Sequence, residues 1–147
     1  MKNESGFTLV GNDEYITTRD TIYTWVKGLV QFRLIIPKGQ NTDLMSSPKF
    51  ARILGFKKED RRTWLASIIH DWVCHKVRYY NGILPAGSYQ AFLNEEWVNC
   101  HEDVWTYKDA DMFFEKILLE SGVHPTKAKA AYISLRLFGW SYRMFNR

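Results

Sequence analysis

Apolar residues between positions 60 and 77 recur in adjacent pairs every four positions, the spacing that gathers side chains on one broad stripe of a helix. The members of this stripe are Trp64, Leu65, Ile68, Ile69, Trp72 and Val73. Asp60 is a good N-cap, so we expect a central helix from about Asp60 to about Val77. His70 and Asp71 fall beside the stripe, where ionisable groups are either held by partners or used for chemistry.

The first 40 residues show β patterns instead. Four segments are rich in β-branched and aromatic residues and are separated by short turn signals. These segments are Phe7–Val10, Tyr15–Thr18, Thr21–Lys27 and Leu29–Ile36. Pro37-Lys38-Gly39 ends the last of them. Short strands with tight connections predict an antiparallel β-meander.

Further helices are expected after the strands. Ser47 can cap a short helix that ends at Gly55. The pattern from Asp109 to Ser121 predicts an amphipathic helix. Pro125 is expected to begin a last helix, which ends at Phe138-Gly139-Trp140. Together with the central helix they make about four. The order, β first and α afterwards, predicts an α+β fold in which the N-terminal meander packs on a C-terminal bundle of about four helices.

Residues 1–147 are expected to form a single domain with four parts: β in 1–40, a loop and the central helix in 41–77, an insertion in 78–106, and C-terminal helices in 107–147. The insertion contains two turn signals and then acidic, aromatic material. Within it, Tyr89 to Trp97 suggests a short amphipathic helix. Loops of this length in a compact domain are often functional.

Composition narrows the class of protein. The chain has 147 residues, 46% of them hydrophobic and 16% aromatic, so it can bury a sizeable core. A net charge of +4, spread along the chain, gives no strong nucleic-acid signal. Cys74 and Cys100 lie in no CxxC pair and are expected to be free thiols. With no signal-peptide pattern and no apolar run long enough for a membrane span, a soluble protein is expected.

Five residues form the candidate functional cluster: Asp43, Ser46, His70, Asp71 and Asp111. In one interpretation they line a catalytic pocket, with His70 as general base and with Asp43, His70 and Asp111 as ligands of a divalent metal that activates water. In a second, Ser46 is a nucleophile. In a third, they form a buried polar network that fixes the fold without chemistry.

The positions of the histidines restrict these interpretations. The metal-dependent phosphohydrolases that use a His-Asp pair also need an earlier histidine, and none precedes His70. His75 lies about 140° from His70 around the helix, so the two do not share a face. Cys74 is one turn after His70, where a Cys-His nucleophile pair is conceivable but a small buried thiol is the commoner case. The pocket and the network remain open alternatives.

A series of short motifs also resembles a domain-of-unknown-function family found mainly in bacteriophages and prophages. The matching pieces are Ile36-Pro37-Lys38-Gly39, Thr42-Asp43-Leu44-Met45-Ser46-Ser47-Pro48, His70-Asp71, Ala110-Asp111-Met112-Phe113-Phe114 and Arg136-Leu137-Phe138-Gly139. Two departures are Lys49 and Lys108, where the family pattern tends to have arginine; lysine keeps the charge but loses the bidentate fork. Residues 78–106 are not covered.

The resemblance implies a phage-encoded protein, made in the host cytoplasm and expected among virion (tail or baseplate) components or accessory factors. Its partners would be other phage structural proteins or a component of the host envelope. The alternative is a hydrolase, with or without a divalent metal, acting on a cell-wall or other small bacterial substrate. A weaker alternative is an inhibitor of a host protein. No established reaction comes with the resemblance.

Overall fold

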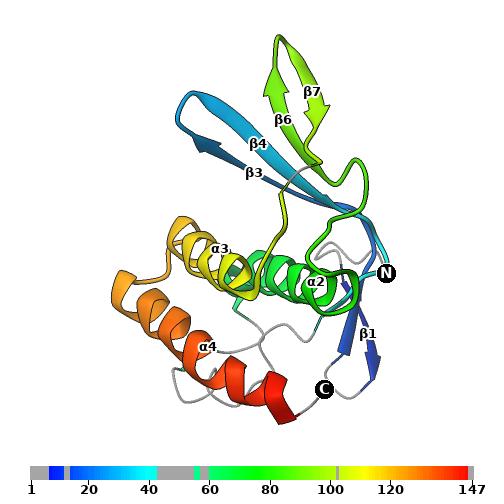
Figure 1. Cartoon of the computed structure of the whole chain (residues 1–147). Coiled ribbons are helices and arrows are strands. Elements are labelled where there is room, and N and C mark those ends of the chain that lie inside the picture. The colour runs from blue at the N-terminus through cyan, green and yellow to red at the C-terminus, as the bar shows by residue number, and fades with distance from the viewer. Residues whose placement is uncertain (1–6, 12–13, 43–54, 57–59, 102, 146–147) are drawn as a thin grey trace.

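The computed structural model describes residues 7–11, 14–42, 55–56, 60–101 and 103–145, and in them the chain is α+β with antiparallel strands (Figure 1). The expected α+β class is therefore confirmed. The bundle of about four helices is wrong, because the described residues contain three α-helices. The short helix expected from Ser47 to Gly55 lies mostly outside the described residues.

The strands form two antiparallel sheets. The smaller has the order β1-β2-β5 and the larger β3-β4-β6-β7. Their bounds are β1 Phe7–Gly11, β2 Glu14–Thr17, β3 Thr21–Lys27, β4 Val30–Ile36, β5 Asn41–Thr42, β6 Tyr89–Leu93 and β7 Glu96–Asn99. All four strands expected before residue 37 are present, but they divide between the two sheets instead of forming one meander. In Figure 1 the β3–β4 and β6–β7 hairpins project side by side from the helices.

The helix expected from Tyr89 to Trp97 is wrong: this stretch forms the β6–β7 hairpin, and β6 pairs with β4. Asn94 and Glu95 form its two-residue turn, with φ of 51° and 65°. Two central residues with positive φ give the turn that suits a tight hairpin, and asparagine tolerates that conformation. Residues 78–106, interpreted from sequence as an insertion, thus supply two strands of the larger sheet.

Capping residues help to set where the first two helices begin. The Asp60 side chain accepts a hydrogen bond from the Arg62 amide and opens a short 3-10 turn, η1 (Arg61–Thr63), which leads directly into α2 (Trp64–Tyr80). α3 (Tyr107–Glu120) is preceded by its N-cap, Thr106, which forms a capping box with Asp109. α4 (Pro125–Phe145) continues past Gly139, where the sequence suggested an end. A glycine inside a helix costs only about 1 kcal/mol, which tertiary packing can outweigh.

The core lies between the helices and one face of the larger sheet. α2 contributes most of its predicted stripe, with Ile68, Ile69, Trp72 and Val73 all buried. Further members of the core cluster come from β3, β4, α3 and α4, and include Tyr23, Leu34, Ile36, Phe114, Ile117, Leu118, Ala128, Ala131 and Leu135. Small alanines on α4 allow its close packing against α3.

Gly82 and Trp105 lie at the two ends of the segment that carries β6 and β7, and a backbone hydrogen bond joins them. The Trp105 amide donates to the Gly82 carbonyl at 2.8 Å, and a Cβ on Gly82 would lie 2.1 Å from the Trp105 carbonyl oxygen. Its φ is +79°, which side chains rarely adopt. We therefore expect Gly82→Ala to lower the free energy of unfolding by about 2 to 3 kcal/mol, measured by urea denaturation.

The control for this prediction is Gly87→Ala. Gly87 has a nearly identical φ of +83°, but a Cβ there would have no atom within 4 Å. The loss of unfolding free energy in Gly87→Ala therefore measures the backbone strain alone, about 1 kcal/mol. Equal losses for the two variants would show that the contact with Trp105 does not matter.

Candidate functional site

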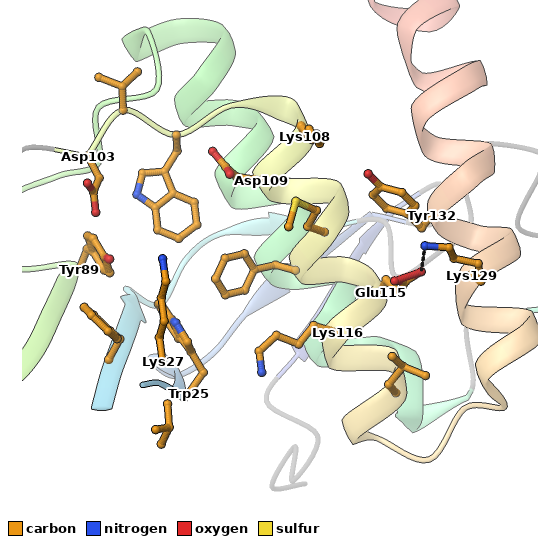
Figure 2. Close-up of a pocket in the computed structure, with 17 residues that line it drawn as sticks. Trp25, Lys27, Tyr89, Asp103, Lys108, Asp109, Glu115, Lys116, Lys129 and Tyr132 are labelled. Atoms are coloured by element: carbon orange, nitrogen blue, oxygen red, sulfur yellow. Dashed lines mark ion pairs between the residues drawn. The ribbon is translucent and has the colours of Figure 1, made fainter. Parts of the chain in front are cut away.

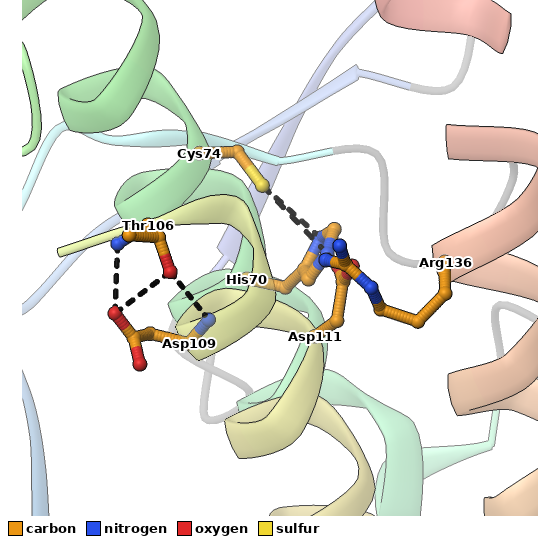
Figure 3. A network of polar contacts seen from close by, with 6 residues as sticks. All are labelled: His70, Cys74, Thr106, Asp109, Asp111 and Arg136. Carbon is orange, nitrogen blue, oxygen red and sulfur yellow. Dashed lines mark hydrogen bonds and ion pairs between the residues drawn. The ribbon is translucent and has the colours of Figure 1, made fainter. Parts of the chain in front are cut away.

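The Asp111 carboxylate is fully buried and binds two cationic side chains (Figure 3). Its Oδ1 lies 2.7 Å from His70 Nε2 and its Oδ2 lies 2.9 Å from Arg136 Nη1. His70 is on α2, Asp111 on α3 and Arg136 on α4. One carboxylate therefore joins all three helices, and its own charge is balanced inside the protein, as a buried ion requires.

Burial by itself lowers the pKa of His70, but the net shift is upward. Cys74 beside the ring, the hydrogen bond with Asp111 and the charge of Asp71 together raise the pKa of His70 to about 10. The imidazole is therefore protonated at neutral pH, and Nε2 donates its proton to Asp111. A protonated histidine cannot accept a proton, so His70 would have to lose this proton before it could act as the general base expected from the sequence.

Cys74 lies one helical turn after His70, as the sequence indicated. Its sulfur is 3.8 Å from Nδ1 and 3.7 Å from Nε2. Nearly equal distances to two ring nitrogens place the sulfur off both N–H directions, and Nε2 already faces Asp111. An activated thiol needs an aligned hydrogen bond to its base. The contact therefore favours a packed thiol over a nucleophile pair.

Asp71 contacts a different element. Its Oδ2 accepts a hydrogen bond of 2.7 Å from the Thr42 hydroxyl, which ties β5 to α2. Thr42 is buried, and it is the residue immediately before Asp43. Asp43 and Ser46 lie outside the described residues, so their expected place in the cluster stays a prediction. The structure thus joins His70 to Asp111 and Asp71 to Thr42.

The expected metal site was Asp43, His70 and Asp111. Of these, His70 and Asp111 bond each other directly, which occupies the Nε2 and Oδ1 atoms that a metal would bind. Over the part of the chain that the structure describes, no cluster of three or more His, Cys, Asp or Glu side chains could hold a metal ion. The contribution of Asp43 is untested.

Sequence reasoning missed two members of the network. Arg136 stood in the quoted Arg-Leu-Phe-Gly motif without a role, although it follows Tyr132 by one helical turn on the inward face of α4. Thr42 also stood in a quoted motif, the one that contains Asp43 and Ser46, without a role of its own. Both could have been found by asking which residues satisfy a carboxylate that falls on a buried helix face.

A second feature is an open pocket of about 1090 Å³ between the larger sheet and α3 (Figure 2). The rings of Trp25, Phe32 and Tyr89 are stacked nearly parallel on its sheet side, with centroids 5.7 to 6.0 Å apart. Phe113 of α3 meets Trp25 edge-on at 4.9 Å. All four rings are only partly buried. These three parallel rings are called the aromatic floor below.

Charged side chains surround this floor. The pocket lining contains four lysines and three acids, a surplus of one positive charge: Lys27, Lys108, Lys116 and Lys129 with Asp103, Asp109 and Glu115. Each acid has an internal partner: Asp109 caps α3, Glu115 pairs with Lys129 at 3.7 Å, and Asp103 accepts from the Tyr89 hydroxyl. None of these residues belongs to the cluster expected from the sequence.

These features define the class: an α+β protein with a buried ion network between its helices and an aromatic pocket against its sheet. The chain belongs to the family described as "Protein of unknown function (DUF1353)", whose model matches residues 18–135. The match includes residues 78–106, which the motif resemblance had left out. The chain matches no curated protein and no solved structure. Within the described residues, no helix has both the length and the apolar character needed to cross a membrane.

Proposed function

We propose that this is a bacteriophage-encoded binding protein, a virion (tail or baseplate) component or an accessory factor, and that the aromatic pocket is its ligand site. The observation that supports the proposal most directly is the open pocket with a partly exposed aromatic floor. In this proposal the His70–Asp111–Arg136 network holds the three helices together. The motifs shared with a phage and prophage family support the phage origin.

Exposed apolar surface around the pocket supports a binding role. Val26, Met112 and Leu119 line it and are 65%, 51% and 42% exposed. A contiguous apolar surface that is left open and rimmed by charges is typical of an interaction site, because leaving it in water costs free energy. The expected partners are a component of the host envelope or another phage structural protein. The envelope suits a concave, charged pocket better, because protein–protein interfaces are broader and flatter.

Sedimentation with isolated bacterial envelopes tests this function. We expect the wild-type protein to pellet with envelopes, and the double variant Lys27→Glu/Lys108→Glu to stay in the supernatant, because it reverses the charge surplus of the pocket. Both lysines are exposed, so the variant should fold normally. Lys38→Glu, which is also exposed but far from the pocket lining, is the matched control.

Mass spectrometry of gradient-purified particles of an encoding phage separates the two roles. A virion component is present in the particles, whereas an accessory factor is absent from them but still binds envelopes. The proposal fails if the protein is absent from particles and the wild type binds envelopes no better than the double variant.

One observation favours the second candidate, a hydrolase: His70 and Asp111 form a 2.7 Å dyad of the kind that orients a general base. We expect purified protein to hydrolyse peptidoglycan and simple esters no faster than His70→Gln, with or without added Mg²⁺, Ca²⁺ or Zn²⁺. An activity that the wild type has, and that a correctly folded His70→Gln lacks, would establish the hydrolase instead.

A further inference from the structure

Within the binding role proposed above, we infer that the pocket takes a carboxylated sugar, a uronic-acid-type unit of a bacterial surface polysaccharide. The inference rests on that role and adds the chemical class of the ligand. It follows from three observations: an aromatic floor, two lysines with no ion-pair partner among the described residues, and a net pocket charge that matches a monoanion.

The floor fits a sugar ring. The planes of Trp25, Phe32 and Tyr89 are within 22° of one another, and each pair of rings is stacked, so the three rings form one compact aromatic cluster in the pocket. The C–H groups of a pyranose carry partial positive charge, and the faces of aromatic rings carry partial negative charge, so the two stack favourably. Because the three rings are only partly buried and line an open pocket, the ring surface that is left accessible can stack on a saturated sugar ring.

The lysines supply the counter-charge. Lys27 and Lys108 line the pocket, and within the described chain neither has an ion-pair partner. Lys27 follows Trp25 by two residues on β3, so both side chains leave the same face of the strand, and both line the pocket (Figure 2). An ammonium group placed there can hold a ligand carboxylate in a charge-assisted hydrogen bond. Lys116, in contrast, has Glu120 at 3.5 Å, and Lys129 has Glu115.

The remaining polar groups fit sugar hydroxyls. Asp103 and Asp109 are exposed or half-buried in the same lining, and carboxylate oxygens have several lone pairs, so each can accept a hydroxyl proton while keeping its internal partner. A phosphate carries up to two negative charges, which the surplus of one positive charge does not balance, and three nearby carboxylates would repel it. A polyol with one carboxylate fits both kinds of pocket group: its carboxylate can bind a lysine, and its hydroxyl groups can donate to the acids.

Isothermal titration calorimetry with two ligands of the same shape tests the inference. The probes are tri-galacturonic acid and its fully methyl-esterified form, which is neutral. We expect the acid to bind and the ester to bind at least about tenfold more weakly, because the lysine contact is charge-assisted. Lys27→Ala should weaken binding of the acid about fivefold or more, while Lys38→Ala leaves it unchanged. Affinity for the acid should fall with added salt.

Three results would overturn the inference. Equal affinity for acid and ester would show that the carboxylate is not recognised, and tighter binding of uridine monophosphate than of the acid would point to a nucleotide site. If neither sugar binds while wild-type protein still pellets with envelopes through Lys27 and Lys108, the ligand class is wrong and the binding role stands. If envelope binding is also absent, the inferred ligand class and the proposed binding role are both wrong.

Discussion

Replacement of Asp111 by asparagine is expected to lower the free energy of unfolding by about 3 to 5 kcal/mol, the range for breaking a buried ion pair from one side. The substitution keeps the size and shape of the side chain but removes the charge that balances His70 and Arg136. The charge of the mostly buried His70 then has no carboxylate at 2.7 Å to balance it, and it lies near Arg136, whose side chain is 37% exposed and keeps part of its hydration. Urea denaturation followed by far-ultraviolet circular dichroism measures the loss.

The matched control is Glu96→Gln, the same change of charge on an exposed strand residue, which should cost less than about 0.5 kcal/mol. The loss in Asp111→Asn should also be smaller at high pH than at neutral pH, because His70 can then relieve the repulsion by releasing its proton. A cost near that of the control would mean that the network does not stabilise the fold.

The second large effect is a fall in stability with rising pH. Because the pKa of His70 is raised from 6.5 to about 10 in the folded protein, its contribution is fully present below pH 6.5 and is lost as the pH rises through 10. The slope within this window approaches about 1.4 kcal/mol per pH unit. Between about pH 7 and about pH 8.5, the wild type should therefore lose about 2 kcal/mol, and His70→Gln should lose much less.

This interval avoids the other shifted groups. Burial raises the pKa of Cys100 above 9 and lowers the pKa of His75 below 6.5, so neither titrates mainly in the interval. His101→Gln, at an exposed position, is expected to keep the wild-type slope. Equal slopes for wild type and His70→Gln would contradict the assignment of the pH dependence to His70.

The sequence predicts best where one physical signal dominates. The stripe from Trp64 to Val73 specified α2, because its period of 3.6 residues over several turns has no competing interpretation. The β-branched segments specified β3 and β4 in the same way. His70 and Asp111, each an ionisable residue in an apolar helical frame, are in direct contact in the structure.

What could not be predicted depends on contacts distant in the sequence. The stretch from Tyr89 to Trp97 satisfies a weak helical period, and its Asn94-Glu95 turn lacks the glycine that marks most such turns, so only pairing with β4 decides that it is a hairpin. The aromatic floor likewise comes from three strands, β3, β4 and β6, and no local pattern shows that Trp25, Phe32 and Tyr89 meet.

The sharing of one carboxylate by two cations has an evolutionary consequence. A relative that loses the acid at position 111 would keep two uncompensated positive charges, so the bases at positions 70 and 136 should be lost with it. Loss of either base alone still leaves the acid in contact with the other base and is easier to tolerate. Across the family, substitutions at 70 and 136 should therefore precede substitution at 111, and lineages without the acid should carry neutral residues at all three positions.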